Sequence, residues 1–212
     1  MPRPFTRLGR HRRYSPERAW EPLSDAEWAA LSPFVFRAAE APGAGRPVRD
    51  PRGRLDAIFW LAANTKPGRA PPPWADLPPA FGKPDTASRQ FRRWAKAGLW
   101  TRLLEALADD HRPGIAVLRR LESWICRAFR RAWRILGVQG MALARRLGFL
   151  SALRGPSWLL PDPDLSEWVF RRVDEELSLG LRAVPKGFLR AAWHVMGTAS
   201  GRRSIPRGLA PP

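Results

Sequence analysis

The sequence predicts an all-α protein, a small helical bundle followed by an arginine-rich helical extension and flanked by disordered tails. Three observations predict this class. Apolar residues recur at the 3.6-residue spacing of helices in several segments, helix-capping signals precede those segments, and no pair of segments alternates as strands do. The 23 prolines and 17 glycines divide the 212 residues into short elements, and 44% hydrophobic residues suffice for a modest core.

The first two helices each begin at a recognisable cap. Ser24-Asp25-Ala26-Glu27 is a capping box and predicts a helix over residues 25–38. Asp50-Pro51, an N-cap followed by proline at the first helical position, predicts a second helix over residues 51–64. Their apolar faces consist of Trp28, Leu31, Phe34 and Val35 in the first, and of Leu55, Ile58, Phe59, Leu61 and Ala62 in the second.

A proline-rich segment then separates the second helix from two more. Residues 66–79 contain too many prolines for a helix, and we expect Trp74 and Leu77 to attach this loop to the core. A third helix is predicted over residues 86–97, capped by Asp85 or Thr86 and ended by Gly98. A fourth follows until residues 111–114, with one apolar face made of Trp100, Leu103, Leu104 and Leu107.

Beyond Gly114 the pattern becomes more basic. Residues 115–136 predict one long amphipathic helix with arginines over much of its surface, interrupted by Gly137 and Gly140, and residues 141–153 predict a shorter one. The acidic residues of 161–180 are expected at a helix N-terminus and on a charged outer face. A last short helix is predicted near 186–196.

These elements suggest four regions. Residues 1–23 form a basic disordered arm, 24–112 a helical domain, 113–180 a helical extension, and 181–212 a basic C-terminal tail.

The net charge of +18 and a pI near 11.7 favour polyanionic partners, nucleic acid first and an anionic membrane surface second. Since 37 − 4 = 33 of the basic residues are arginine, a GC-rich coding sequence accounts for part of the excess, and charge alone decides little. The single cysteine, Cys126, excludes an internal disulfide, and His11, His111 and His194 lack metal-ligand spacing, so we expect no cofactor. Neither a secretory signal nor a transmembrane segment is indicated, and the expected location is the cytoplasm.

The third predicted helix carries the pattern most suggestive of function. Ala87, Phe91, Trp94 and Ala95 share one face, and cationic and polar side chains surround the other. A helix anchored in this way on two supporting helices can present its long cations to a DNA groove. The same pattern also fits a solvated basic face on an ordinary core helix. The candidate DNA-binding residues are Thr86, Ser88, Arg89, Gln90, Arg92, Arg93 and Lys96, with phosphate contacts from Arg46, Arg12 and Arg13.

Six ordered motifs over residues 23–107 resemble the N-terminal helix-turn-helix-like domain of bacterial insertion-sequence (DDE-type) transposases. The residues that match the family's motifs are Leu23-Ser24-Asp25-Ala26-Glu27-Trp28, Gly45-Arg46-Pro47, Arg54 to Leu61, Trp74-Ala75-Asp76-Leu77-Pro78, Phe81-Gly82, and Arg92-Arg93-Trp94 through Gly98 to Trp100. The resemblance implies a module that binds double-stranded DNA at element ends, followed in the family by a nuclease domain of the ribonuclease-H type.

Two departures from the family limit what can be carried over. The chain has a longer stretch at residues 66–73, and the match ends near Arg112, where the family would continue into strands bearing a catalytic aspartate. Strand transfer needs three carboxylates around two metal ions, and the later acidic residues lie in helix-like sequence. We therefore expect DNA binding without an enzymatic activity, with DNA, a full-length transposase or a second copy as partners. Two alternatives stay open: a basic amphipathic protein of the membrane surface acting through residues 115–153, and a non-functional insertion-element remnant, whose tail need not fold.

Overall fold

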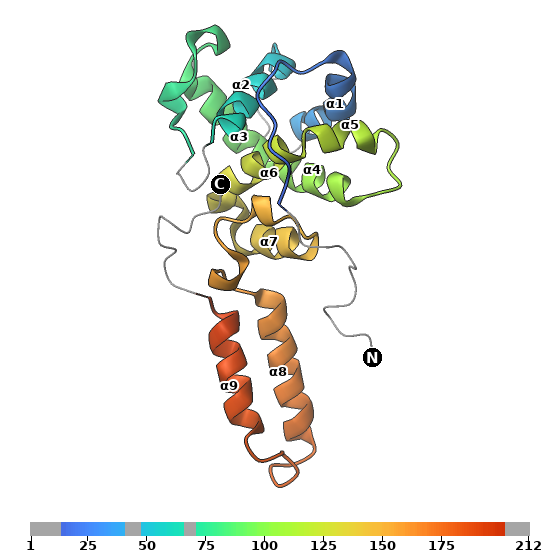
Figure 1. Cartoon of the computed structure of the whole chain (residues 1–212), viewed down its shortest axis with the longest axis vertical. Coiled ribbons are helices and arrows are strands. Elements are labelled where there is room, and N and C mark those ends of the chain that lie inside the picture. The colour runs from blue at the N-terminus through green and yellow to red at the C-terminus, as the bar shows by residue number, and fades with distance from the viewer. Residues whose placement is uncertain (1–13, 41–47, 66–70, 202–212) are drawn as a thin grey trace.

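A computed structural model describes residues 14–40, 48–65 and 71–201. The described residues contain helices and no strand, which confirms the predicted all-α class. Helices α1 (Asp25–Ala39), α2 (Pro51–Ala63), α3 (Pro84–Lys96), α4 (Leu99–Ala108), α5 (Ile115–Arg120) and α6 (Glu122–Arg131) form a bundle. Helix α7 (Trp133–Arg146) lies at one end of it, and α8 (Pro163–Ser178) and α9 (Phe188–Ala199) project from that end as a hairpin (Figure 1).

The predicted caps of α1 and α2 are confirmed. The Ser24 hydroxyl accepts a hydrogen bond from the Glu27 amide, and the Glu27 carboxylate accepts one from the Ser24 amide at 3.0 Å. Asp50 caps α2 by accepting from the Gly53 amide at 2.8 Å, and Pro51 occupies the first turn. Because each cap satisfies amides that have no partner within the helix, the two starts are fixed locally by the sequence.

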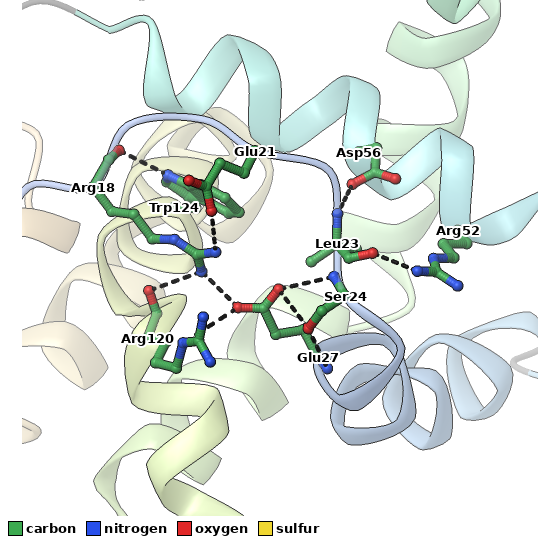
Figure 2. A network of polar contacts seen from close by, with 9 residues as sticks. All are labelled: Arg18, Glu21, Leu23, Ser24, Glu27, Arg52, Asp56, Arg120 and Trp124. Carbon is green, nitrogen blue, oxygen red and sulfur yellow. Dashed lines mark hydrogen bonds and ion pairs between the residues drawn. The ribbon is translucent and has the colours of Figure 1, made fainter.

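Glu27 also joins α1 to the chain before it and to α5 (Figure 2). Its side chain is 1% exposed and lies 2.7 Å from Nη1 of Arg18 and 3.7 Å from Nε of Arg120. Burial alone raises the pKa of Glu27, but the hydrogen bonds from Arg18 and Ser24 and the charge of Arg18 outweigh it, so the pKa lies below its ordinary value.

Residues 14–23 pack against the bundle, in contrast to the disordered arm expected over residues 1–23. The Trp124 indole donates to the carbonyl of Arg18 at 3.1 Å, and the Arg18 guanidinium stacks on the Trp124 ring. Leu23 is buried, and its amide donates to Asp56 of α2. Sequence reasoning missed this packing because the segment has no periodic pattern, although Trp20 and Leu23 are apolar. Residues 1–13 lie outside the described part of the chain.

The expected single helix over residues 115–136 is wrong. It is divided into α5, α6 and the start of α7, with breaks at Leu121 and Ala132. All residues of α6 from Glu122 to Arg130 are buried, and α6 packs in the same hydrophobic core as α2 and α4. A helix buried on all sides has no solvent face, so α6 is a core helix and not part of one long amphipathic helix.

Two of the arginines expected on a solvated face are therefore interior. The Arg127 guanidinium donates to the carbonyls of Ala62 and Ala63 at the end of α2 and pairs with Glu17 at 3.1 Å. Arg130 is 6% exposed, and burial, with the nearby charge of Arg127, lowers its pKa to about 10. Arg127 can be buried because its guanidinium donors reach the carbonyls of Ala62 and Ala63 at the end of α2.

This packing bears on both alternatives. A membrane-surface role through residues 115–153 requires an available amphipathic helix, and α6 is enclosed in the core. The residues after 113 that share the core are folded, since Leu118, Trp124 and Phe149 pack with Leu55 and Trp100. None of the helices in the described part of the chain combines the length and the hydropathy that spanning a bilayer requires.

The last elements begin with α7, which is broken at Gly137 (φ 60°, ψ −154°) as predicted, whereas Gly140 lies within the helix. Two short 3₁₀ helices, Leu150–Ala152 and Ser157–Leu159, lead to α8. Asp162 caps α8 by accepting from the Leu165 amide and pairs with Arg145 at 3.1 Å, which agrees with a helix N-terminus at the start of the acidic segment.

Candidate nucleic-acid interface

Helix α3 begins earlier than the sequence suggested. Asp85 or Thr86 was expected as the cap, but the helix starts at Pro84 with Lys83 at the N-cap position and no side-chain cap. Gly82 precedes it with φ 81° and ψ −160°, a backbone conformation that is essentially restricted to glycine. Gly82 turns the chain, and the fixed φ of Pro84 starts the helix without a missing hydrogen bond.

One face of α3 is anchored in the core by apolar side chains. Ala87, Phe91, Trp94 and Ala95 are buried, as predicted. The Phe91 ring lies 5.3 Å from the Trp100 ring of α4 and 5.4 Å from the Trp74 ring of the preceding loop.

The aromatic contacts continue through the bundle. The Phe59 ring of α2 lies 6.4 Å from the ring of Trp100 and 5.6 Å from that of Trp124 in α6. A continuous series of rings thus joins the loop, α3, α4, α2 and α6. Because such rings bury large areas and pack in preferred orientations, they fix the position of α3 on the helices beneath it.

The loop before α3 is attached to the core at both predicted positions. Trp74 belongs to the 3₁₀ helix Trp74–Asp76, which a second one, Pro79–Phe81, follows. Leu77 is buried with Ala57, Leu61 and Ala87. The Arg131 guanidinium, 4.4 Å from the Trp74 ring, also donates to the Pro72 carbonyl at 2.8 Å. Residues on α6 thereby help to hold the segment that orients α3.

The opposite face of α3 is cationic and open to solvent. Thr86, Arg89, Arg92, Arg93 and Lys96 are exposed. None of these four cations forms an ion pair with a residue that the structure describes. Arg92 is directed along its own helix, with Nε 3.3 Å from the Ser88 carbonyl and Nη2 3.3 Å from the Ser88 hydroxyl. The remaining guanidinium donors of Arg92 are free to bind an anion.

Two expected contact residues are placed differently. Gln90 is 8% exposed and belongs to the buried side of α3, because it lies one residue before Phe91 and four before Trp94. Ser88 is half-buried and supports Arg92. The structure adds Lys83, which is exposed directly before the first turn of α3. Arg12, Arg13 and Arg46, the expected phosphate contacts, lie outside the described residues.

The acidic side chains after residue 160 are mostly engaged in helix capping and ion pairs. Glu167 pairs with Arg171 at 2.9 Å, Arg172 pairs with Glu175 at 2.8 Å, and Asp164 pairs with Arg146. Among the residues that the structure describes, no group of three or more histidine, cysteine, aspartate or glutamate side chains is arranged to hold a metal ion.

An anchored helix with an open cationic face on a small helical bundle is an arrangement that DNA-recognition modules use. Residues 23–104 match the family described as "Putative transposase of IS4/5 family (DUF4096)", which confirms the resemblance read from the sequence over this region. The matched segment runs from Leu23 to Leu104 and so includes α1, α2, α3 and the first part of α4. No curated protein and no solved structure matches the chain.

Proposed function

We propose that this chain binds double-stranded DNA at the ends of an insertion element through the exposed face of α3, and that it does so without cutting the DNA. The observation that carries the proposal is the unpaired cationic face of a helix whose other face is fixed in the core. The transposase-family match of residues 23–104 supports DNA as the polyanion that this cationic face binds. In a cell the chain would lie in the cytoplasm, with the nucleoid when bound to DNA.

The side chains of α3 suit the two parts of DNA recognition. Arginine forms bidentate hydrogen bonds with guanine in the major groove, which is wide enough for an α-helix. Lysine and the remaining arginines can bind phosphates, and each neutralised phosphate contributes about 0.9 to the salt slope of binding. We assign Arg89, Arg92 and Arg93 as candidates for base or phosphate contacts, and Lys83 and Lys96 as phosphate contacts at the two ends of the helix.

The experiment compares binding to a duplex carrying the terminal inverted repeat of a neighbouring element with binding to a scrambled duplex. The unmodified chain is expected to prefer the repeat. Replacing Arg92→Ala and Arg93→Ala together should weaken binding to both duplexes at least tenfold. The matched control is Arg182→Ala with Lys186→Ala, which removes the same charge from exposed positions in the α8–α9 connection. Equal binding by the two double variants would contradict the proposal.

The absence of cutting is tested on the same DNA. We expect a labelled element-end duplex to stay intact with the chain and Mg²⁺ or Mn²⁺ under conditions that saturate binding. Cleavage or strand transfer that co-purifies with the chain would refute this part of the proposal. A full-length transposase or a second copy is the expected protein partner at the element end.

A further inference from the structure

The α8–α9 hairpin projects from the bundle (Figure 1). It buries little of its own apolar surface. The two helices are antiparallel, and the Asp162 amide before α8 donates to the Ala199 carbonyl at the end of α9 at 2.7 Å. Within residues 163–199, only Val169 and Ala199 are fully buried. The hairpin therefore has apolar side chains that its own packing leaves uncovered.

These side chains form one stripe on each helix. On α8 the stripe consists of Phe170, Val173 and Leu177, and on α9 it consists of Leu189, Trp193 and Met196, all at the three- and four-residue spacing that places side chains on one helix face. Phe170 is 64% exposed and Trp193 is 78% exposed.

The two stripes lie on the same face of the hairpin. Val169 on α8 and Phe188 on α9 lie on the sides of the two helices that face each other. Phe170 and Leu189 each come one residue later, so both stripes are rotated about their helix axes in the same direction from these contact residues. In an antiparallel pair, equal displacements bring both stripes to one side. The other side carries Arg172 and Glu175, which pair with each other, as well as Trp168.

The charges of the hairpin indicate what covers this face. Helix α8 (residues 163–178) has five acidic and two basic residues, a net charge of 2 − 5 = −3. Residues 179–199 have three basic residues and no acidic ones, a net charge of +3. Two copies of the hairpin are complementary when α8 of one lies on α9 of the other, and they repel when α8 lies on α8.

We propose that two copies of this chain associate through the apolar faces of their α8–α9 hairpins, forming an antiparallel four-helix bundle whose two-fold axis runs along the hairpin. This is the isologous arrangement common in homodimers, and four helices of this type bury a shared core. An aromatic side chain buries about 150–250 Å², so Phe170 and Trp193 of both copies, together with four further apolar residues from each, approach the roughly 1,200 Å² of a stable interface.

The test measures the mass of the full chain in solution by light scattering over a range of concentrations. We expect about twice the 23.9 kDa of one chain. Phe170→Glu with Trp193→Glu should give single chains with unchanged helical circular dichroism. Ala191→Glu, an exposed position on the other side of α9, is the matched control and should remain dimeric.

A charge exchange tests the pairing of α8 with the partner's α9. Asp174 and Arg190 are exposed, and each lies beside the apolar stripe of its helix, Asp174 four residues after Phe170 and Arg190 three before Trp193. Arg190→Glu should raise the dimer dissociation constant several-fold, and adding Asp174→Arg should restore it.

A monomeric unmodified chain would overturn the proposal, as would dimers insensitive to Phe170→Glu with Trp193→Glu. A monomer that co-sediments with anionic vesicles would assign the face to a membrane instead. DNA binding is measured separately, so its loss or survival does not decide this proposal.

Discussion

Replacement of Glu27 by glutamine tests whether the buried carboxylate joins α1, α5 and residues 14–23 into one unit. The carboxamide keeps the shape of the side chain and can still accept from the Ser24 amide, but it removes the negative charge beside Arg18 and Arg120. A hydrogen bond to a charged group is worth about 1.5–3 kcal/mol. We therefore expect Glu27→Gln to lower the free energy of unfolding by about 2 kcal/mol, and the melting temperature by about 4–8 °C for a chain of this size.

The matched control is Glu21→Gln, which removes a carboxylate from the same arginine. Glu21 is 71% exposed and lies 3.6 Å from Arg18, so its loss should change the stability by less than about 0.5 kcal/mol. Urea unfolding followed by circular dichroism gives both values. Similar losses of unfolding free energy for the two variants would show that burial of Glu27 does not strengthen its ion pair with Arg18, and would refute the reasoning.

The pH dependence of the same pair supplies a second measurement. Because the folded-state pKa of Glu27 is depressed, its stabilising contribution is complete above the unfolded carboxyl pKa of about 4.3. It is lost as the pH falls through the folded-state pKa. The difference in stability between the unmodified chain and Glu27→Gln should therefore be constant near neutral pH and shrink on acidification. A difference that grows as the pH falls would contradict the assigned direction.

Three further substitutions test the packing around α3. Trp100→Ala removes the ring between Phe59 and Phe91 and should cost about 3–5 kcal/mol in urea unfolding; a cost below about 1 kcal/mol would show that the aromatic series does not anchor α3. Gly82→Ala should lower the free energy of unfolding by about 1–3 kcal/mol. The cause would be the positive φ alone, since no atom lies near the added methyl group. An unchanged melting temperature would show that the turn relaxes. Arg127→Met keeps most of the buried volume but removes the guanidinium donor of the Ala63 carbonyl, whereas the Ala62 carbonyl keeps the Thr65 amide as a donor. We expect a loss of about 2 kcal/mol in chemical unfolding, against no loss if water replaces the guanidinium.

The elements that sequence reasoning placed well are those whose ends are set by local chemistry. Ser24 with Glu27, and Asp50 with Pro51, satisfy helix amides through residues within one turn, so the starts of α1 and α2 could be predicted. The exposed cations of α3 followed in the same way from their spacing relative to Phe91 and Trp94. The burial of Gln90 could not be predicted in this way, because a residue at the edge of the apolar stripe can lie on either the buried or the exposed side of the helix.

The elements that were placed wrongly depend on tertiary packing. The helix is interrupted at Leu121 and Ala132, although neither residue is a glycine or a proline. The interruptions arise from the packing of α6 against α2 and α4. Arg127 looks like a surface residue in the sequence, and only its contact with the end of α2 makes its burial favourable. The packing of residues 14–23 likewise depends on partners such as Trp124, about a hundred residues away.

The salt dependence of duplex-DNA binding tests the central claim most directly. With affinity measured by fluorescence anisotropy across a series of salt concentrations, each lost phosphate contact lowers the slope of log affinity against log salt by about 0.9. If both arginines bind phosphates, Arg92→Ala with Arg93→Ala should lower the slope by about 1.8, while Arg182→Ala with Lys186→Ala leaves it unchanged. Equal slopes for the unmodified chain and the Arg92/Arg93 variant, with equal affinities, would mean that these two arginines do not contact DNA, and would contradict the account.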